Sequence, residues 1–88
     1  MKGRSLYVLL KILQADRICA AARIAHGKLY VSIESPTETE LPWTRIFETS
    51  ETRRAADWLS DCAVSLYPKS ALAKVRRLVA EAMAALPR

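Results

Sequence analysis

The residues that could carry out chemistry are few. His26 is the only histidine, and it stands beside Gly27 with no second ligand or catalytic partner near it in sequence. The two cysteines, Cys19 and Cys62, lie far apart, and neither belongs to a C-x-x-C pair. Metal sites and activated nucleophiles need several such side chains together. We therefore predict a protein with no enzymatic activity, no bound metal and no cofactor, in which His26 is a turn residue.

Three glutamates, Glu34, Glu38 and Glu40, fall in one short segment that contains no basic residue. Two carboxylates held together in an apolar site can act as an acid pair, because burial raises one pKa. Nothing apolar surrounds these three in the sequence. We predict a solvated acidic loop bounded by Pro36 and Pro42, and we take its glutamates as one candidate partner-binding surface.

A second candidate surface is basic. The net charge is +5, and most of the excess lies near the C-terminus. The candidate residues are Lys69, Lys74, Arg76 and Arg77. They could form an ordinary solvated helix face, on which Arg77 pairs with Glu81 four residues later. They could also bind nucleic-acid phosphates or dock on an acidic protein surface. No aromatic residues stand between them, which argues against a platform for stacked bases.

Two helices must position these groups. Residues 51–66 place apolar side chains at helical spacing, and Thr49 or Ser50 precedes them as a candidate N-cap. Pro68 ends this helix, and Ser70 can cap a second one. The apolar residues of the second helix are Leu72, Val75, Leu78, Val79, Ala82, Met83 and Leu86. We expect both apolar stripes to cover a sheet.

The sheet is predicted from alternating apolar residues in segments 18–24, 29–33 and 43–47. If His26 and Gly27 form a two-residue hairpin loop, Ile24 faces Leu29 and Ala22 faces Val31. The apolar positions of both strands then share one face, which favours this register.

Residues 5–25 are open to two interpretations. Leu6, Val8, Leu10 and Ile12 alternate as in a buried strand, which we prefer. The alternative is one long helix over residues 5–25 with Gly27 as its left-handed stop. The preferred fold is α+β, one domain spanning residues 1–88. It is an antiparallel meander of three to four strands packed on two C-terminal helices in the order β-β-β-β-α-α, a two-layer sandwich.

This order resembles the small phage-encoded anti-CRISPR proteins that act on type I interference complexes. The shared pattern is a hairpin that turns at a glycine, a strand ending in Arg45-x-Phe47, an acidic and hydroxyl-rich cap at 48–51, and a helix carrying Trp58 before a last helix. It covers residues 17–86 in architecture. The resemblance implies a non-enzymatic protein that binds an RNA-guided surveillance complex and blocks target DNA. It assigns no contact residues.

Together these features predict a small protein-interaction module, an inhibitor of a larger nucleoprotein assembly such as a CRISPR surveillance complex. The alternative is a nucleic-acid-binding accessory protein that uses the basic last helix. Exposed strand edges and the apolar run from Leu6 to Leu13 also make a homodimer an option.

No apolar run is long enough to cross a membrane. Because Lys11 interrupts the N-terminal apolar run, we expect a cytoplasmic protein rather than a secreted one.

Overall fold

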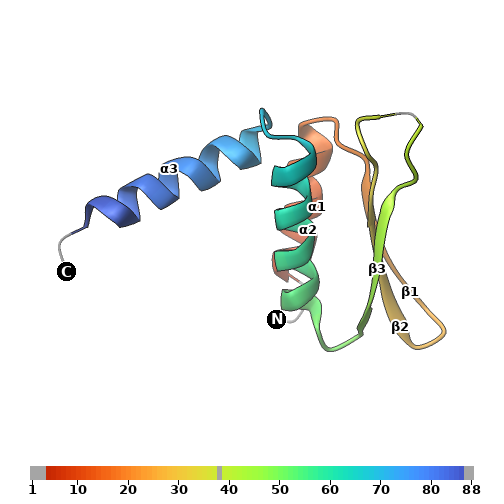
Figure 1. The fold of residues 1–88 in the computed structure, drawn as a ribbon. Coiled ribbons are helices and arrows are strands. Elements are labelled where there is room, and N and C mark those ends of the chain that lie inside the picture. Colours follow the sequence, from red (N-terminus) through yellow and green to blue (C-terminus); the bar gives the residue numbers. More distant parts are fainter. Residues whose placement is uncertain (1–3, 38, 87–88) are drawn as a thin grey trace.

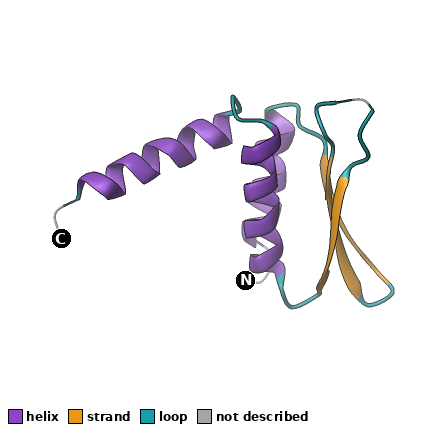
Figure 2. Cartoon of the chain, in the orientation of Figure 1, coloured by secondary structure: helices purple, strands orange, loops and turns teal. Residues whose placement is uncertain are grey.

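The computed structural model describes residues 4–37 and 39–86. Figures 1 and 2 show three helices and a small sheet. The elements in chain order are α1 (Arg4–Ala15), β1 (Ala20–Ala25), β2 (Lys28–Ile33), β3 (Trp43–Glu48), α2 (Thr52–Leu66) and α3 (Ala71–Ala85). The α+β class is confirmed, and the order is α-β-β-β-α-α.

The sheet is the predicted antiparallel meander, with strand order β1-β2-β3. Ile24 lies opposite Leu29 and Ala22 lies opposite Val31, so the predicted hairpin register is confirmed. The two loop residues, His26 and Gly27, have φ angles of 53° and 71°. Two-residue hairpin loops of type I′ require such left-handed backbone at both positions. The single histidine is therefore placed in a tight turn.

The predicted first strand is wrong, because residues 4–15 form helix α1. Leu6, Leu9 and Leu13 are buried at the spacing of a helix face. Nearly every position from 6 to 13 is apolar, so the run fits a strand and a helix equally well, and leucine favours the helix. The alternative of one helix over residues 5–25 is also wrong, since β1 begins at Ala20.

Helix α1 ends at a left-handed residue that is not glycine. Arg17 has a φ of 61°. Its N–H donates to the carbonyl of Gln14 at 3.0 Å, and the N–H of Ile18 donates to the carbonyl of Leu13 at 2.9 Å. These two bonds are the pattern of a Schellman motif, and Leu13 and Ile18 are both buried, as the hydrophobic contact of that motif requires. The motif turns the chain from α1 into β1.

The core lies between one face of the sheet and the two helices α1 and α2, which lie side by side (Figure 1). Helix α1 contacts β1, whereas α2 contacts β2 and β3. The largest fully buried side chains are Leu13, Val31, Ile33 and Leu59. Phe47 and Trp58 join β3 to α2 by an edge-to-face contact with ring centroids 6.0 Å apart.

Helix α3 departs most from the expected fold. Figure 1 shows it leaving the end of α2 and extending away from the sheet. Among residues 71–85 only Ala73 is buried. Helices α1 and α2 pack on the apolar face of the sheet, and α3 packs on α2. The predicted two-layer sandwich, with both C-terminal helices on the sheet, is therefore not found. Within the described residues, no helix combines the length and the apolar character needed to cross a membrane.

Candidate functional site

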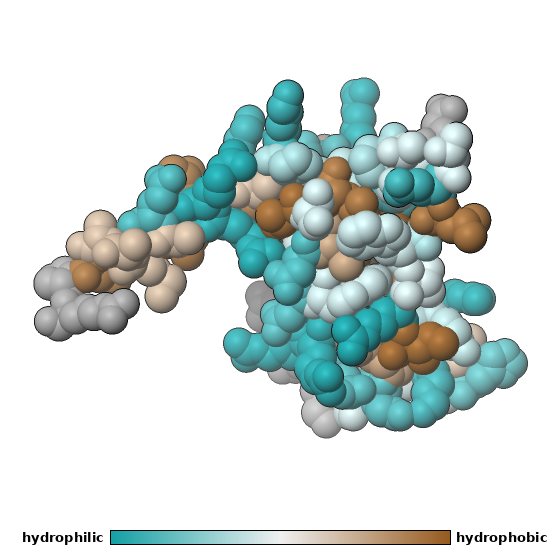
Figure 3. Space-filling model, viewed as in Figure 1, coloured by the Kyte–Doolittle hydropathy of each residue, from teal (hydrophilic) through white to brown (hydrophobic). Residues whose placement is uncertain are grey.

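Helix α3 exposes a row of large apolar side chains, which we call the α3 stripe. It consists of Val75, Leu78, Val79, Met83 and Leu86. Their exposed fractions lie between 51% and 67%. The spacing of the first four places them on one face of the helix, and Leu86 follows at the extended C-cap position. Figure 3 shows hydrophobic and hydrophilic side chains next to each other along this arm. The sequence predicted an apolar stripe here and assigned all of it to the core, but only Leu72 in the first turn packs against the core.

Burying the side chains of the stripe against another surface would be energetically favourable. Full burial of one such side chain is worth about 1.5–3 kcal/mol relative to exposure. Single exposed apolar residues are common, but contiguous patches rimmed by polar groups mark interaction sites. The stripe has polar neighbours on the same helix, including Lys74, Arg76 and Glu81. It therefore has the composition of an interface.

The first turn of α3 is fixed to the rest of the molecule by two caps. The Ser70 hydroxyl accepts a hydrogen bond from the N–H of Ala73 at 3.2 Å, so the predicted cap is confirmed. Asp16, beyond the end of α1, accepts from the N–H of Ala71 at 2.9 Å. A carboxylate here also meets the positive end of the helix dipole. No sequence signal linked Asp16 to α3, because the two are 55 residues apart.

Two of the four predicted basic residues hold the angle between α2 and α3. Arg76 donates to Asp61 at 2.9 Å and to Ser60 at 3.3 Å, both on α2. Arg77 donates to the carbonyl of Pro68 at 3.1 Å. A guanidinium used in this way is less available to a phosphate. The basic face is therefore partly a structural brace.

The remaining charged groups of α3 are exposed. Lys69 and Lys74 have no ion pair or side-chain hydrogen bond within residues 4–37 and 39–86, and neither does Glu81. The expected pair between Arg77 and Glu81 is not formed, because Arg77 points back to Pro68. Lys74 and Glu81 are thus free to meet charges on a partner.

The acidic loop is not brought to the same place as the basic residues of α3. It lies beside the sheet, while α3 extends in the opposite direction (Figure 1). The backbone carbonyl of Glu34 accepts from the Tyr67 hydroxyl at 2.6 Å, and the Glu40 carboxylate accepts from Ser35 at 2.9 Å. Glu38 lies outside the described residues. The Glu34 bond involves its backbone only, and it places the start of the acidic loop beside Tyr67, two residues before Lys69.

The cysteines show no sign of activation. A hydrogen bond to the Glu34 carboxylate, together with its negative charge, raises the pKa of the exposed Cys19 thiol. Burial raises the pKa of Cys62. A nucleophilic cysteine needs the opposite shift. In the part of the chain that is described, no group of three or more His, Cys, Asp or Glu side chains is arranged to hold a metal ion.

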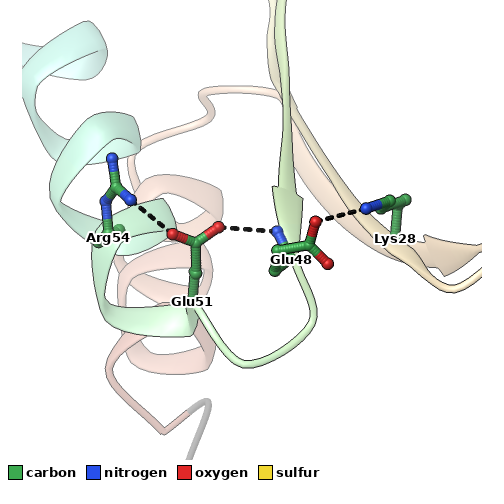
Figure 4. A network of polar contacts seen from close by, with 4 residues as sticks. All are labelled: Lys28, Glu48, Glu51 and Arg54. Atoms are coloured by element: carbon green, nitrogen blue, oxygen red, sulfur yellow. Dashed lines mark hydrogen bonds and ion pairs between the residues drawn. The ribbon is translucent and has the colours of Figure 1, made fainter.

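The joint between β3 and α2 contains the chain of polar contacts drawn in Figure 4. The Glu51 carboxylate accepts from the backbone N–H of Glu48 at 2.9 Å and pairs with Arg54 at 2.5 Å. Lys28 pairs with Glu48 across the strands. The predicted cap at Thr49 or Ser50 is wrong, because Glu51 holds the N-cap position without a side-chain cap bond. The hydrogen bond from Glu48 is the main cause that lowers the pKa of Glu51.

An apolar hollow lies at the base of α3, at the connection 67–70 that we call the elbow. Its volume is about 380 Å³. It is lined by the end of α1 and by the elbow, including Ile18, Leu66, Tyr67 and Pro68. A larger hollow of about 870 Å³ lies between α1 and β1 and is lined by Tyr7, Leu10 and Cys19 among others. The lining of the elbow hollow ends at Ser70, the N-cap of α3.

Comparison with protein-family models, with curated proteins and with solved structures finds no match for the chain.

Proposed function

We propose that the protein is a non-enzymatic protein-interaction module whose interface is the α3 stripe. The observation that carries this proposal is the projecting helix itself. It presents five large apolar side chains to solvent, and braces from Arg76, Arg77 and Asp16 hold it at a fixed angle. A helix held in place before binding loses less conformational entropy on binding, which favours affinity.

The stripe supports a protein partner over nucleic acid. Nucleic-acid binding draws on free cations aimed at phosphates. On α3, Arg76 and Arg77 already bind groups of the same chain, and the stripe is apolar. Amphipathic helices with apolar anchors at this spacing dock in hydrophobic grooves of other proteins. Glu34 and Glu40 in the acidic loop stay a predicted second contact.

The proposal extends to the setting in which the protein acts. The partner class that the sequence resemblance implies is a large RNA-guided assembly, and blocking it requires a protein surface rather than a catalytic site. Cys19 and Cys62 are both free thiols, which supports a reducing compartment such as the cytoplasm.

The test is an affinity capture of the tagged chain from native host lysate after nuclease treatment. The wild type should retain a protein partner. Leu78→Glu places a charge in the stripe and should lose it, whereas Ile46→Glu, at an exposed apolar residue on β3 outside both candidate surfaces, should keep it. Circular dichroism of each variant confirms the fold.

Two results would contradict the proposal. Capture that disappears with nuclease would mean nucleic-acid binding through Lys69 and Lys74. Capture that Leu78→Glu leaves unchanged would mean that α3 is not the interface.

A further inference from the structure

The charges beside the α3 stripe follow a pattern that limits what can cover it. Lys74 and Glu81 are seven residues, or two helical turns, apart, so they lie on the same face of the helix. Leu78 lies between them, four residues after Lys74 and three before Glu81, so both charges border the stripe. Within the described residues neither charge has a partner.

The charges of two copies of α3 are complementary when the two helices run antiparallel. If two copies of α3 cross in opposite directions near Leu78, Lys74 of each copy faces Glu81 of the other. If they run in the same direction, the two-fold symmetry places these charges of the two copies on opposite edges of the contact, so Lys74 of one copy does not meet Glu81 of the other. Closed two-fold interfaces pair one surface patch with itself in this way. We infer that the α3 stripe binds the α3 stripe of a second copy of this chain, antiparallel, with two Lys74–Glu81 pairs at its edge.

The inference rests on the proposed function, because it names the occupant of the same surface. The buried surface would comprise the five side chains of the stripe and the neighbouring alanines on each copy. Summed over both copies, the buried accessible area is on the order of 1,000 Å², the lower limit of a specific interface. The dimer should therefore be weak, with a dissociation constant on the order of micromolar or above.

The same register brings a second apolar surface into the contact. With Lys74 opposite Glu81, the C-terminal end of α3 in one copy, at Ala85, lies opposite the N-cap Ser70 of the other, at the elbow. The apolar elbow hollow opens there and is lined by Leu66, Tyr67 and Pro68. At 1.5 Å per residue, α3 is about 22 Å long, so the two bodies lie at opposite ends of the paired helices.

Charge reversal tests both the occupant and its direction. Sedimentation equilibrium is run over about 10 µM to 1 mM, a range that brackets a weak dimer. The wild type should pass from one chain to two. Lys74→Glu and Glu81→Lys should each weaken the dimer by on the order of tenfold, because each variant places like charges opposite one another twice. An equimolar mixture of the two variants should regain the wild-type affinity, since each carries the charges that the other needs.

Several results would overturn the inference. One is a wild type that stays a single chain at the highest concentration. Another is a dimer that both charge variants form as well as the wild type does. A third is a mixture that is no tighter than either variant alone. If the chain is monomeric but Leu78→Glu still abolishes capture of a partner protein from lysate, the dimer inference fails and the proposed function stands. If Leu78→Glu changes neither result, the proposed function fails as well.

Discussion

Arg17 and His26 both have left-handed backbone, and each sits where the chain reverses direction. The turn at His26 was predictable, because Gly27 follows it and two alternating segments flank the pair. At Arg17 no glycine or asparagine marks the end of α1. A Schellman motif needs the backbone conformation rather than a particular side chain, so this helix end could not be read from residue types.

Arg17→Gly should therefore stabilise the protein. Glycine adopts positive φ without the steric cost that a Cβ imposes, and that cost is about 1–2 kcal/mol. Part of the gain is offset by the greater freedom of glycine in the unfolded chain, so we expect a net increase of about 0.5–1 kcal/mol in the free energy of unfolding. Urea denaturation measures it.

The matched control for this change is Arg23→Gly, which puts glycine into strand β1 and should lower stability. A loss of stability in Arg17→Gly would show that the Arg17 side chain, and not its backbone, supports the turn.

The same contrast between local and distant signals holds for the site residues. The Ser70 cap was predictable because a cap and its helix are adjacent in sequence. Arg76 binds Asp61 of α2, and the first N–H of α3 binds Asp16, just beyond the end of α1, so both partners are distant in sequence. No pattern in one sequence pairs such residues, so the brace at the elbow was missed and its arginines were assigned to a partner.

Among the elements, α2 and the hairpin were predicted and α1 was not. Helix α2 has one clear apolar side, with Ala55, Leu59 and Cys62 buried as the periodicity indicated. The run from 6 to 13 is apolar on nearly every side, so its period was ambiguous. The fold class survived this error, because the hairpin register depends on β1 and β2 alone.

Helix α3 shows a different limit. Its stripe was identified, yet periodicity says only that a face is apolar and not what covers it. Whether the cover is the sheet or another molecule depends on how much apolar sheet surface is left. That surface was already used by α1, the element that the sequence misassigned.

The joint between β3 and α2 gives a pH-dependent prediction. The backbone N–H of Glu48 holds the pKa of Glu51 below its ordinary value of 4.5. A lowered folded-state pKa stabilises the fold fully above the ordinary value and loses this contribution as the pH falls through the folded value. Glu51→Gln should thus be less stable than the wild type at pH 7, and the difference should shrink as the pH falls below about 4.5.

Thermal unfolding over a pH series measures this difference. Asp57→Asn serves as the control, because Asp57 lies exposed on the same helix and has no side-chain hydrogen bond or ion pair in the described part of the chain. Its difference from the wild type should stay small throughout. A Glu51→Gln difference that is unchanged down to acid pH would show that the carboxylate charge does not hold the joint.

At the scale of the whole molecule, the protein consists of a small body and a helical arm. The principal extents of 47 × 34 × 19 Å reflect the arm. A chain of 88 residues has little apolar material to spare. Even so, five of its large apolar side chains lie outside the body, and both proposals depend on this observation.

The most direct test of that fact compares Leu59→Ala with Leu78→Ala, measured at dilutions where the unfolding midpoint no longer depends on protein concentration. Leu59 is 0% exposed and Leu78 is 64% exposed. Leu59→Ala should lower the free energy of unfolding by about 2–5 kcal/mol, because it leaves a cavity in the core. Leu78→Ala should change it by less than about 0.5 kcal/mol, as an exposed substitution does. A loss at Leu78 as large as that at Leu59 would mean that α3 packs in the core and presents no stripe to a partner.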